Sequence, residues 1–225
     1  LGEIRHLEFD AKTGAGTLAL PHKLPKPLEF ESIDIAGDVR NAFDTVNITE
    51  AKIDFGQPRL ELSVFASRLG DNIRAHLEAE VSGLQMSELA QYWPEKLGSS
   101  AHAWTTTNIP SGQVERGKLA LILDVPIASP TEPEIRSMSG SLEYENLVVD
   151  YFNPFPKAMG IGGSASFTKD RFDLKVARGK LLDLDLDHGV INITGLDTDA
   201  EEIAIDLVLR GPLSTALVLA DREPL

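Results

Sequence analysis

Apolar and polar residues alternate with a period of two along most of this chain, in short runs separated by glycine and proline. The clearest run extends from Leu119 to Ile127, and another extends from Ile73 to Val81. Because successive side chains of a β-strand point to opposite faces, each run predicts a strand with one apolar and one polar face. Turn residues recur at intervals of roughly ten residues, which is typical of antiparallel meanders. We therefore predict an all-β fold with one or two short helices, in which repeated antiparallel meanders form a curled sheet that is either groove-like or sandwich-like.

One stretch, which contains both tryptophans, departs from this alternation. In Met86–Trp93 the apolar residues recur at i, i+3, i+4 and i+7, which predicts a short helix. Ser87 is its predicted N-cap, and Pro94 its predicted end. A second short helix is predicted from Ser99 or Ser100 to Asn108, with Trp104 on its buried side.

The second half of the chain repeats the pattern of the first. Gly83 and Gly211 lie 128 residues apart, as do Leu89 and Leu217, and in both halves a five-strand run leads through the glycine into the start of a helix. We predict three parts: a first meander at 1–80, a helical junction at 81–113, and a second meander at 114–225 that ends in a helix start. Together they are expected to form one continuous domain cut from a larger protein.

Composition excludes several classes of function. The formal net charge is −14, from 35 acidic and 21 basic residues, which argues against a nucleic-acid partner and against simple adhesion to an anionic membrane surface. The chain has no cysteine, so disulfides, thiolate metal sites and cysteine nucleophiles are excluded. No stretch approaches the roughly 20 apolar residues that cross a bilayer, and the chain starts at Leu1 without a methionine. We expect a soluble segment of a larger protein.

The motifs that suggest chemistry have simpler structural explanations. Leu182–Gly189 resembles a calcium loop but lacks its glycine and final glutamate, so we predict a strand with its leucines inward and its aspartates in water. Gly160–Ala165 matches a dinucleotide-binding pattern, but a strand rather than a helix follows it, so we predict a turn. Asn47–Thr49 and Asn192–Thr194 fit the N-glycosylation triplet. The histidines show no metal-ligand spacing; they are His6, His22, His76, His102 and His188. We predict no catalytic residue, no metal site and no cofactor.

A resemblance to a known family rests on a short ordered motif. It comprises Tyr92-Trp93-Pro94, then Trp104, Asn108 and Gly112, and it is similar to the AsmA-like superfamily, in particular its YhdP-like, TamB-related branch of bacterial envelope proteins. Leu142–Phe167 also resembles that family's strand, proline-rich link and next strand. The resemblance implies structural roles for the six motif residues.

The resemblance also implies a biological setting. It places the chain in the periplasm, within a parent protein anchored in the bacterial inner membrane. There, neighbouring repeats of the parent would pair with this segment and phospholipid would pass toward the outer membrane along a β-lined apolar groove.

Our leading hypothesis is therefore a non-enzymatic lipid-groove segment that binds phospholipid acyl chains and supports outer-membrane integrity. An apolar strand face that remains open offers a site for acyl chains, and each buried CH₂ contributes about 0.8 kcal/mol. The candidate groove residues are Leu119, Leu121, Leu123, Val125, Leu142, Tyr144, Leu174 and Val176. The alternative is a structural or protein-interaction β-domain with a closed core, because alternation does not distinguish an open groove from a filled core.

Overall fold

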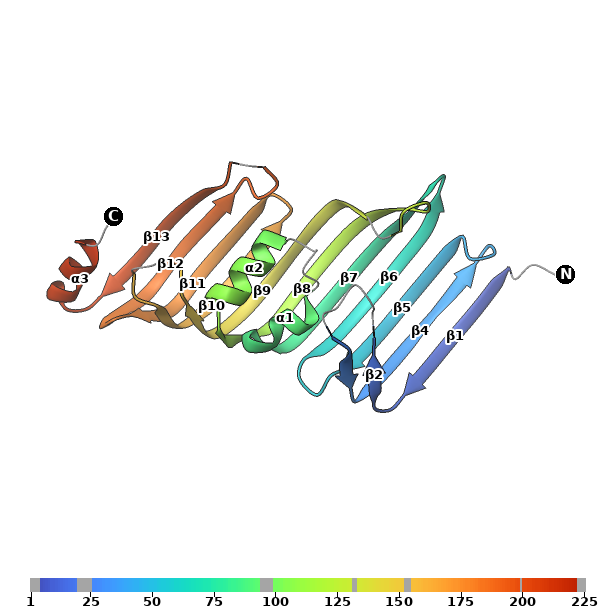
Figure 1. Cartoon of the computed structure of the whole chain (residues 1–225), viewed down its shortest axis with the longest axis horizontal. Helices are drawn as coiled ribbons and strands as arrows, with labels where there is room; N and C mark the ends of the chain where they lie inside the picture. Colours follow the sequence, from blue (N-terminus) through green and yellow to red (C-terminus); the bar gives the residue numbers. More distant parts are fainter. Residues whose placement is uncertain are drawn as a thin grey trace. The chain divides into compact units, whose positions relative to one another are not determined.

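Most of the described chain forms one antiparallel meander of eleven strands. The computed structural model describes residues 5–19, 26–93, 99–130, 133–151, 155–198 and 200–221. In hydrogen-bonded order, the strands are β1 (His6–Thr13), β4 (Ser32–Arg40), β5 (Thr45–Asp54), β6 (Arg59–Leu69), β7 (Asn72–Gln85), β8 (Ser111–Pro126), β9 (Glu134–Val149), β10 (Ala158–Thr168), β11 (Arg171–Leu181), β12 (Leu184–Thr194) and β13 (Glu202–Arg210) (Figure 1). The sheet does not close, because its order begins at β1 and ends at β13.

The remaining elements of the described residues are short. A separate antiparallel pair consists of β2 (Gly16–Leu18) and β3 (Leu28–Phe30). The helices are η1 (Met86–Glu88), α1 (Leu89–Tyr92), α2 (Ser99–Asn108) and α3 (Leu213–Ala220). The prediction of an all-β fold with short helices and an antiparallel meander is thus confirmed.

The chain divides into two compact units. Unit 1 comprises residues 1–19, 27–82 and 117–140, and unit 2 comprises residues 20–26, 83–116 and 141–225. In unit 1, Ile35 of β4 lies opposite Ala51 of β5, and Val64 of β6 lies opposite Leu77 of β7. Cross-strand pairing thus places apolar residues beside apolar residues, strand after strand, and gives this part of the sheet one apolar and one charged face.

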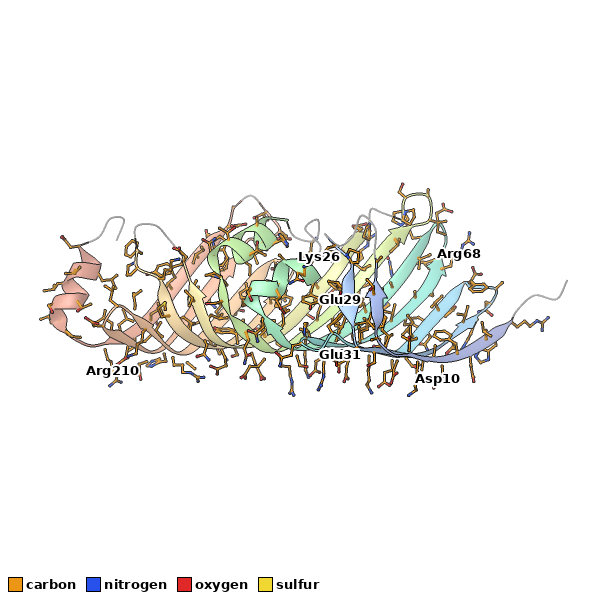
Figure 2. The ribbon with its side chains drawn as sticks, turned by 60° about the horizontal axis from the view of Figure 1, so that its bottom comes forward. Asp10, Lys26, Glu29, Glu31, Arg68 and Arg210 are labelled. Atoms are coloured by element: carbon orange, nitrogen blue, oxygen red, sulfur yellow. The ribbon has the colours of Figure 1, made fainter. Side chains whose placement is uncertain are left out.

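Unit 2 carries a more extensive core on the apolar side of its strands. Twelve of the sixteen buried apolar side chains of the described residues belong to it. One cluster joins Leu181 and Leu184, at the β11–β12 turn, to Leu219 of α3. In Figure 2, the side chain of Arg210 points away from one side of the sheet of this unit, and α1 and α2 lie on the opposite side. Helices therefore cover part of the apolar side of unit 2.

Both halves of the meander end in the same order of elements. β7 contains Gly83 near its end and leads into η1 and α1, and β13 leads through Gly211 into α3. Gly83 adopts a φ of +71°, a backbone conformation that favours glycine. The predicted division at 80/81 and 113/114 stays a prediction.

The structure corrects several local expectations. Val46, Ile48 and Ile53 all belong to the single strand β5, and a register shift between Ile48 and Ala51 in its pairing with β6 keeps their side chains on one face. Gly160–Ala165 is not a turn but part of β10. The pairing of β10 with β11 shifts register between Met159 and Gly162 and again between Gly162 and Gly163, so the strand continues through these glycines.

Other corrections concern single side chains. Leu182 lies in the β11–β12 turn at φ +56° and is not directed inward, whereas Leu184 and Leu186 are buried as predicted. Trp104 is 47% exposed rather than on a buried side. Ser87 lies inside η1 and does not cap it, because the N-cap of η1 is Gln85. Pro94, the predicted end of the first helix, lies outside the described residues.

Candidate lipid-binding surface

The apolar face of unit 1 extends over β1 and β4–β8. It consists of side chains that alternate with charged ones on β1 and β4–β8. They are Leu7, Phe9, Ile33, Ile35, Val46, Ile48, Ile53, Leu60, Leu62, Val64, Leu77, Val81, Leu119, Leu121, Leu123 and Val125. Cross-strand pairing aligns the rows of β1 and β4–β7 directly, for example Phe9 opposite Gly37 and Leu62 opposite Ala79.

Two ion pairs fix the orientation of β8. Lys118 pairs with Glu80, and Asp124 pairs with Arg74, both on the charged face of β7. Lys118 and Asp124 are an even number of residues apart, so their side chains lie on the same face of β8. The odd-numbered residues between and beside them therefore lie on the opposite face. The predicted groove residues Leu119, Leu121, Leu123 and Val125 therefore lie together on the apolar face of unit 1.

Most side chains of this face are incompletely covered. In unit 1 the buried apolar residues among those described are Leu28, Val39, Ala51 and Leu121. The other members of the face are half-buried, and Leu7 is exposed. In Figure 2, Asp10 points from the charged face of unit 1, and the short β2–β3 pair lies on the opposite side of the sheet. This pair therefore covers part of the apolar face. A monomeric protein seldom leaves a long apolar surface half-covered unless something binds there.

The opposite face of unit 1 is held by ionic contacts. The carboxylate of Asp124 is only 5% exposed and accepts two hydrogen bonds from Arg74, at 2.8 and 2.9 Å, and one from Arg136 at 2.7 Å. These hydrogen bonds hold the pKa of Asp124 well below its usual range. Sequence reasoning missed this cluster, because its partners lie on different strands.

Smaller clusters of the same kind occur in both units. In unit 1, Asp38 accepts hydrogen bonds from Asn47 at 3.0 Å and from Arg40 at 2.7 and 3.1 Å. These hydrogen bonds lower the pKa of Asp38, and the hydrogen bond from Asn47 has the largest effect. In unit 2, Asn192 donates to Asp173 at 2.6 Å. Both asparagines of the glycosylation-like triplets thus use their side-chain amide nitrogen within the sheet.

The four candidate groove residues of unit 2 differ in accessibility. Leu142 and Leu174 are half-buried, whereas Tyr144 and Val176 are buried. The hydroxyl of Tyr144 donates to the backbone carbonyl of Lys175 at 3.2 Å, and burial raises the pKa of this phenol to about 12. Tyr144 reaches that carbonyl across Gly163, where a Cβ would meet both groups. Tyr144 and Val176 therefore contribute packing to unit 2, and the assignment of these four residues to a groove stays a prediction.

The tryptophan-containing motif forms the junction between α1, α2 and the following strands in unit 2. Trp93 meets the ring of His102 edge-on, with 5.4 Å between the ring centroids. Asn108 ends α2 by donating its side-chain amide to the carbonyl of Trp104 at 2.9 Å, and its own carbonyl accepts from Asp150 N–H at 2.8 Å. These contacts give the motif a role in positioning α2.

Gly112 and Tyr92 complete the described part of the motif. Gly112 adopts φ +105°, and a Cβ there would lie 2.6 Å from the Cα of Leu147, so only glycine fits. Tyr92 is half-buried, and burial raises the pKa of its phenol.

The sequence model of the family described as YhdP protein matches residues 3–225. The chain belongs to the YhdP family. No curated protein and no solved structure gives a significant match to it.

The described residues offer little for other kinds of site. Within the described ranges, no group of three or more histidine, cysteine, aspartate or glutamate side chains is arranged to hold a metal ion. Over the same part of the chain, no helix has the length and apolarity to span a membrane.

Further apolar rows share the face of the candidate residues on β8. The rows on β4–β7 belong to the same apolar face as Leu119–Val125, and their alternation is visible in the sequence. What the sequence did not reveal is that unit 1 leaves these rows half-exposed whereas unit 2 buries more of its own.

Proposed function

We propose that this YhdP-family chain is a non-enzymatic lipid-binding segment and that the apolar face of unit 1 binds phospholipid acyl chains. The observation that carries the proposal is the half-exposed row of aliphatic side chains on each of β4–β8, opposite a face of ion pairs. Leucine, isoleucine and valine provide contact area without a fixed polar contact, which suits a chain that must move along the surface. Each CH₂ removed from water contributes about 0.8 kcal/mol.

The charged face supports the same function from the other side. Its ion pairs include Lys12 with Asp34, Arg59 with Asp54 and Arg74 with Asp124. Charged groups stay in water, so a lipid has one favourable side on which to bind. The net charge of −14 disfavours binding to the anionic surface of a bilayer, which is consistent with lipids being taken up singly.

The family suggests the setting that we propose. The segment would act in the periplasm, in a parent protein anchored in the inner membrane, with neighbouring repeats of the parent pairing with this segment. Phospholipid would then move toward the outer membrane and support its integrity.

The test is to identify lipid that purifies with the chain. Organic extraction followed by mass spectrometry is expected to find phospholipid in the wild-type protein. Val64→Asp places a charge on the apolar face and is expected to reduce the bound lipid several-fold. Ser63→Asp changes the preceding residue of β6, which lies on the charged face; this variant is the matched control and should retain the lipid. Absence of phospholipid from the wild-type chain, together with no labelling by a photoreactive phospholipid, would refute the proposal.

A second function, a structural or protein-interaction β-domain, is favoured by the packing of unit 2. Its cluster of Leu181, Leu184 and Leu219 is closed by α3. Under this alternative both Val64→Asp and Ser63→Asp leave the amount of extracted lipid at background, so one experiment separates the two functions.

A further inference from the structure

The short ribbon of β2 and β3 leaves the sheet of unit 1 between two strands that are already neighbours. β1 ends at Thr13, which pairs with Ile33 at the start of β4, so both ends of the ribbon leave the sheet at one place. In the hydrogen-bonded order, β2 and β3 form a separate two-stranded sheet. Antiparallel neighbours such as β1 and β4 can be joined by a two-residue turn. The ribbon is therefore not needed to join them.

The ribbon has one covered side and one exposed side. Leu18 pairs with Leu28; Leu28 is 6% exposed and Leu18 is half-buried. Thr17 and Glu29, the neighbouring pair, are exposed, because successive side chains of a strand point to opposite sides. Figure 2 places the ribbon on the apolar side of unit 1. The two leucines therefore face the surface for which we propose acyl-chain binding.

Short links at both ends of the ribbon are suited to act as hinges. Gly14 and Ala15 join β1 to β2, and a Cβ at Gly14 would meet no atom within 4 Å. Glu31 alone joins β3 to β4, and its backbone N–H donates to the carbonyl of Asp54 at 2.7 Å. In Figure 2 the chain rises from Glu31, at the sheet, to Lys26, farther from it. Rotation at these links moves the ribbon and leaves the pairing of β1 with β4 intact.

Internal packing keeps the ribbon together, whereas few of its side chains are covered. The ring of Phe30 lies over Gly16 so closely that a Cβ there would be 2.7 Å from a ring carbon. Leu28 is the one buried side chain among the described residues of the ribbon. A two-stranded ribbon with so little buried surface opens at low cost. An acyl chain offers the apolar face the same kind of contact as Leu28.

We infer that the β2–β3 ribbon is a lid on the apolar face of unit 1. Leu28 closes the lid while no lipid is bound, and an acyl chain that takes its place lifts the ribbon. The inference rests on the proposed lipid binding and adds a regulation of that site. Loading of lipid then requires opening of the ribbon, so weaker closure gives faster loading.

Movement of the ribbon can be measured with spin labels, because the chain has no cysteine of its own. Thr17→Cys combined with Glu61→Cys places one label on the ribbon and one on the sheet. Lys12→Cys combined with Glu61→Cys is the matched control, since both residues lie on the charged face of the sheet. Adding phosphatidylcholine vesicles is expected to produce a second, longer distance in the first pair and to leave the control pair unchanged, as measured by double electron–electron resonance.

The rate of loading provides a second measurement. A photoreactive amino acid at Leu123 reports radiolabelled phosphatidylcholine that reaches the apolar face from vesicles. Leu28→Ser removes the closing contact and should raise the initial rate of labelling several-fold. Glu29→Ser, on the exposed side of the ribbon, is the matched control and should label at the wild-type rate. The spin-label measurement does not depend on whether Leu28→Ser folds.

Failure of the lid and failure of lipid binding give different results. Labelling at Leu123 with an unchanged distance between the labels at positions 17 and 61 would refute the lid alone. So would an equal change in both label pairs, because the sheet itself would then deform, or a folded Leu28→Ser variant that is labelled no faster than the wild type. Absence of labelling at Leu123 in every variant would refute lipid binding and the lid together.

Discussion

Truncation of two leucines in one hairpin gives the sharpest test of how unit 2 is packed. Leu184 is 2% exposed and packs with Leu181 and Leu219, whereas Leu182, two residues earlier in the turn, is 44% exposed. Both can be changed to alanine, so the two variants lose the same atoms. Only their surroundings differ.

The expected losses follow from those surroundings. Leu184→Ala removes about three buried carbon groups and leaves a cavity, and such changes cost about 3–4 kcal/mol of the free energy of unfolding. Leu182→Ala loses only the covered part of its surface and leaves no closed cavity, so its cost is about 1 kcal/mol. The difference of about 2–3 kcal/mol is a change of about thirty-fold or more in the folding equilibrium.

Urea denaturation followed by far-ultraviolet circular dichroism measures both values. Unchanged slopes with denaturant concentration would show that the free energy of unfolding, rather than the compactness of the unfolded state, has changed. Equal losses in the two variants would refute the packing described for Leu184, as would a cost below about 1 kcal/mol for Leu184→Ala.

Three further predictions concern single residues. The pKa of Asp124 is lowered in the folded state, so its ionised carboxylate stabilises the fold above the unfolded-state pKa of about 3.9, and this contribution is lost as the pH falls toward the folded-state pKa. Asp124→Asn should therefore be less stable than the wild type at neutral pH and should lose less stability on acidification. Thermal unfolding measured across pH checks both expectations. Tyr144→Phe should cost about 1 kcal/mol by loss of the hydrogen bond to Lys175. Burial raises the pKa of Tyr144 to about 12, so ultraviolet titration of the wild type should show one phenol ionising near pH 12, and the stability that depends on the neutral phenol should be lost as the pH rises from about 10 toward 12. Gly112→Ala should destabilise the chain by about 2 kcal/mol or more, because φ +105° and contact with Leu147 both oppose a Cβ; a melting temperature equal to that of the wild type would contradict this.

The fold was predictable where local periodicity determines it. The alternation of Leu119, Leu121, Leu123 and Val125 specifies both a strand and the face of each side chain, and the structure confirms the strand. The predicted helix from Ser99 or Ser100 to Asn108 is likewise present as α2. These features depend on residues close together in the sequence.

The parts that were not predictable depend on residues far apart. Asp124 and Arg74 are fifty positions apart, and nothing in the sequence indicates that strands β7 and β8 bring them together. The glycines of Gly160–Ala165 signal a turn locally, but pairing with β11 accommodates them in a strand. Trp104 lies on a helix whose packing leaves it exposed. In each case tertiary contacts outweigh local preference.

Whether the apolar face of unit 1 contacts lipid can be measured directly on β8. A photoreactive amino acid at Leu123 lies on that face, whereas one at Ala120 of the same strand lies on the charged face with Lys118 and Asp124. After incubation of each variant with vesicles containing radiolabelled phospholipid and illumination, we expect labelled lipid to be cross-linked at Leu123 and to be at background at Ala120. Equal labelling at both positions, or labelling at Ala120 alone, would contradict a lipid-binding apolar face.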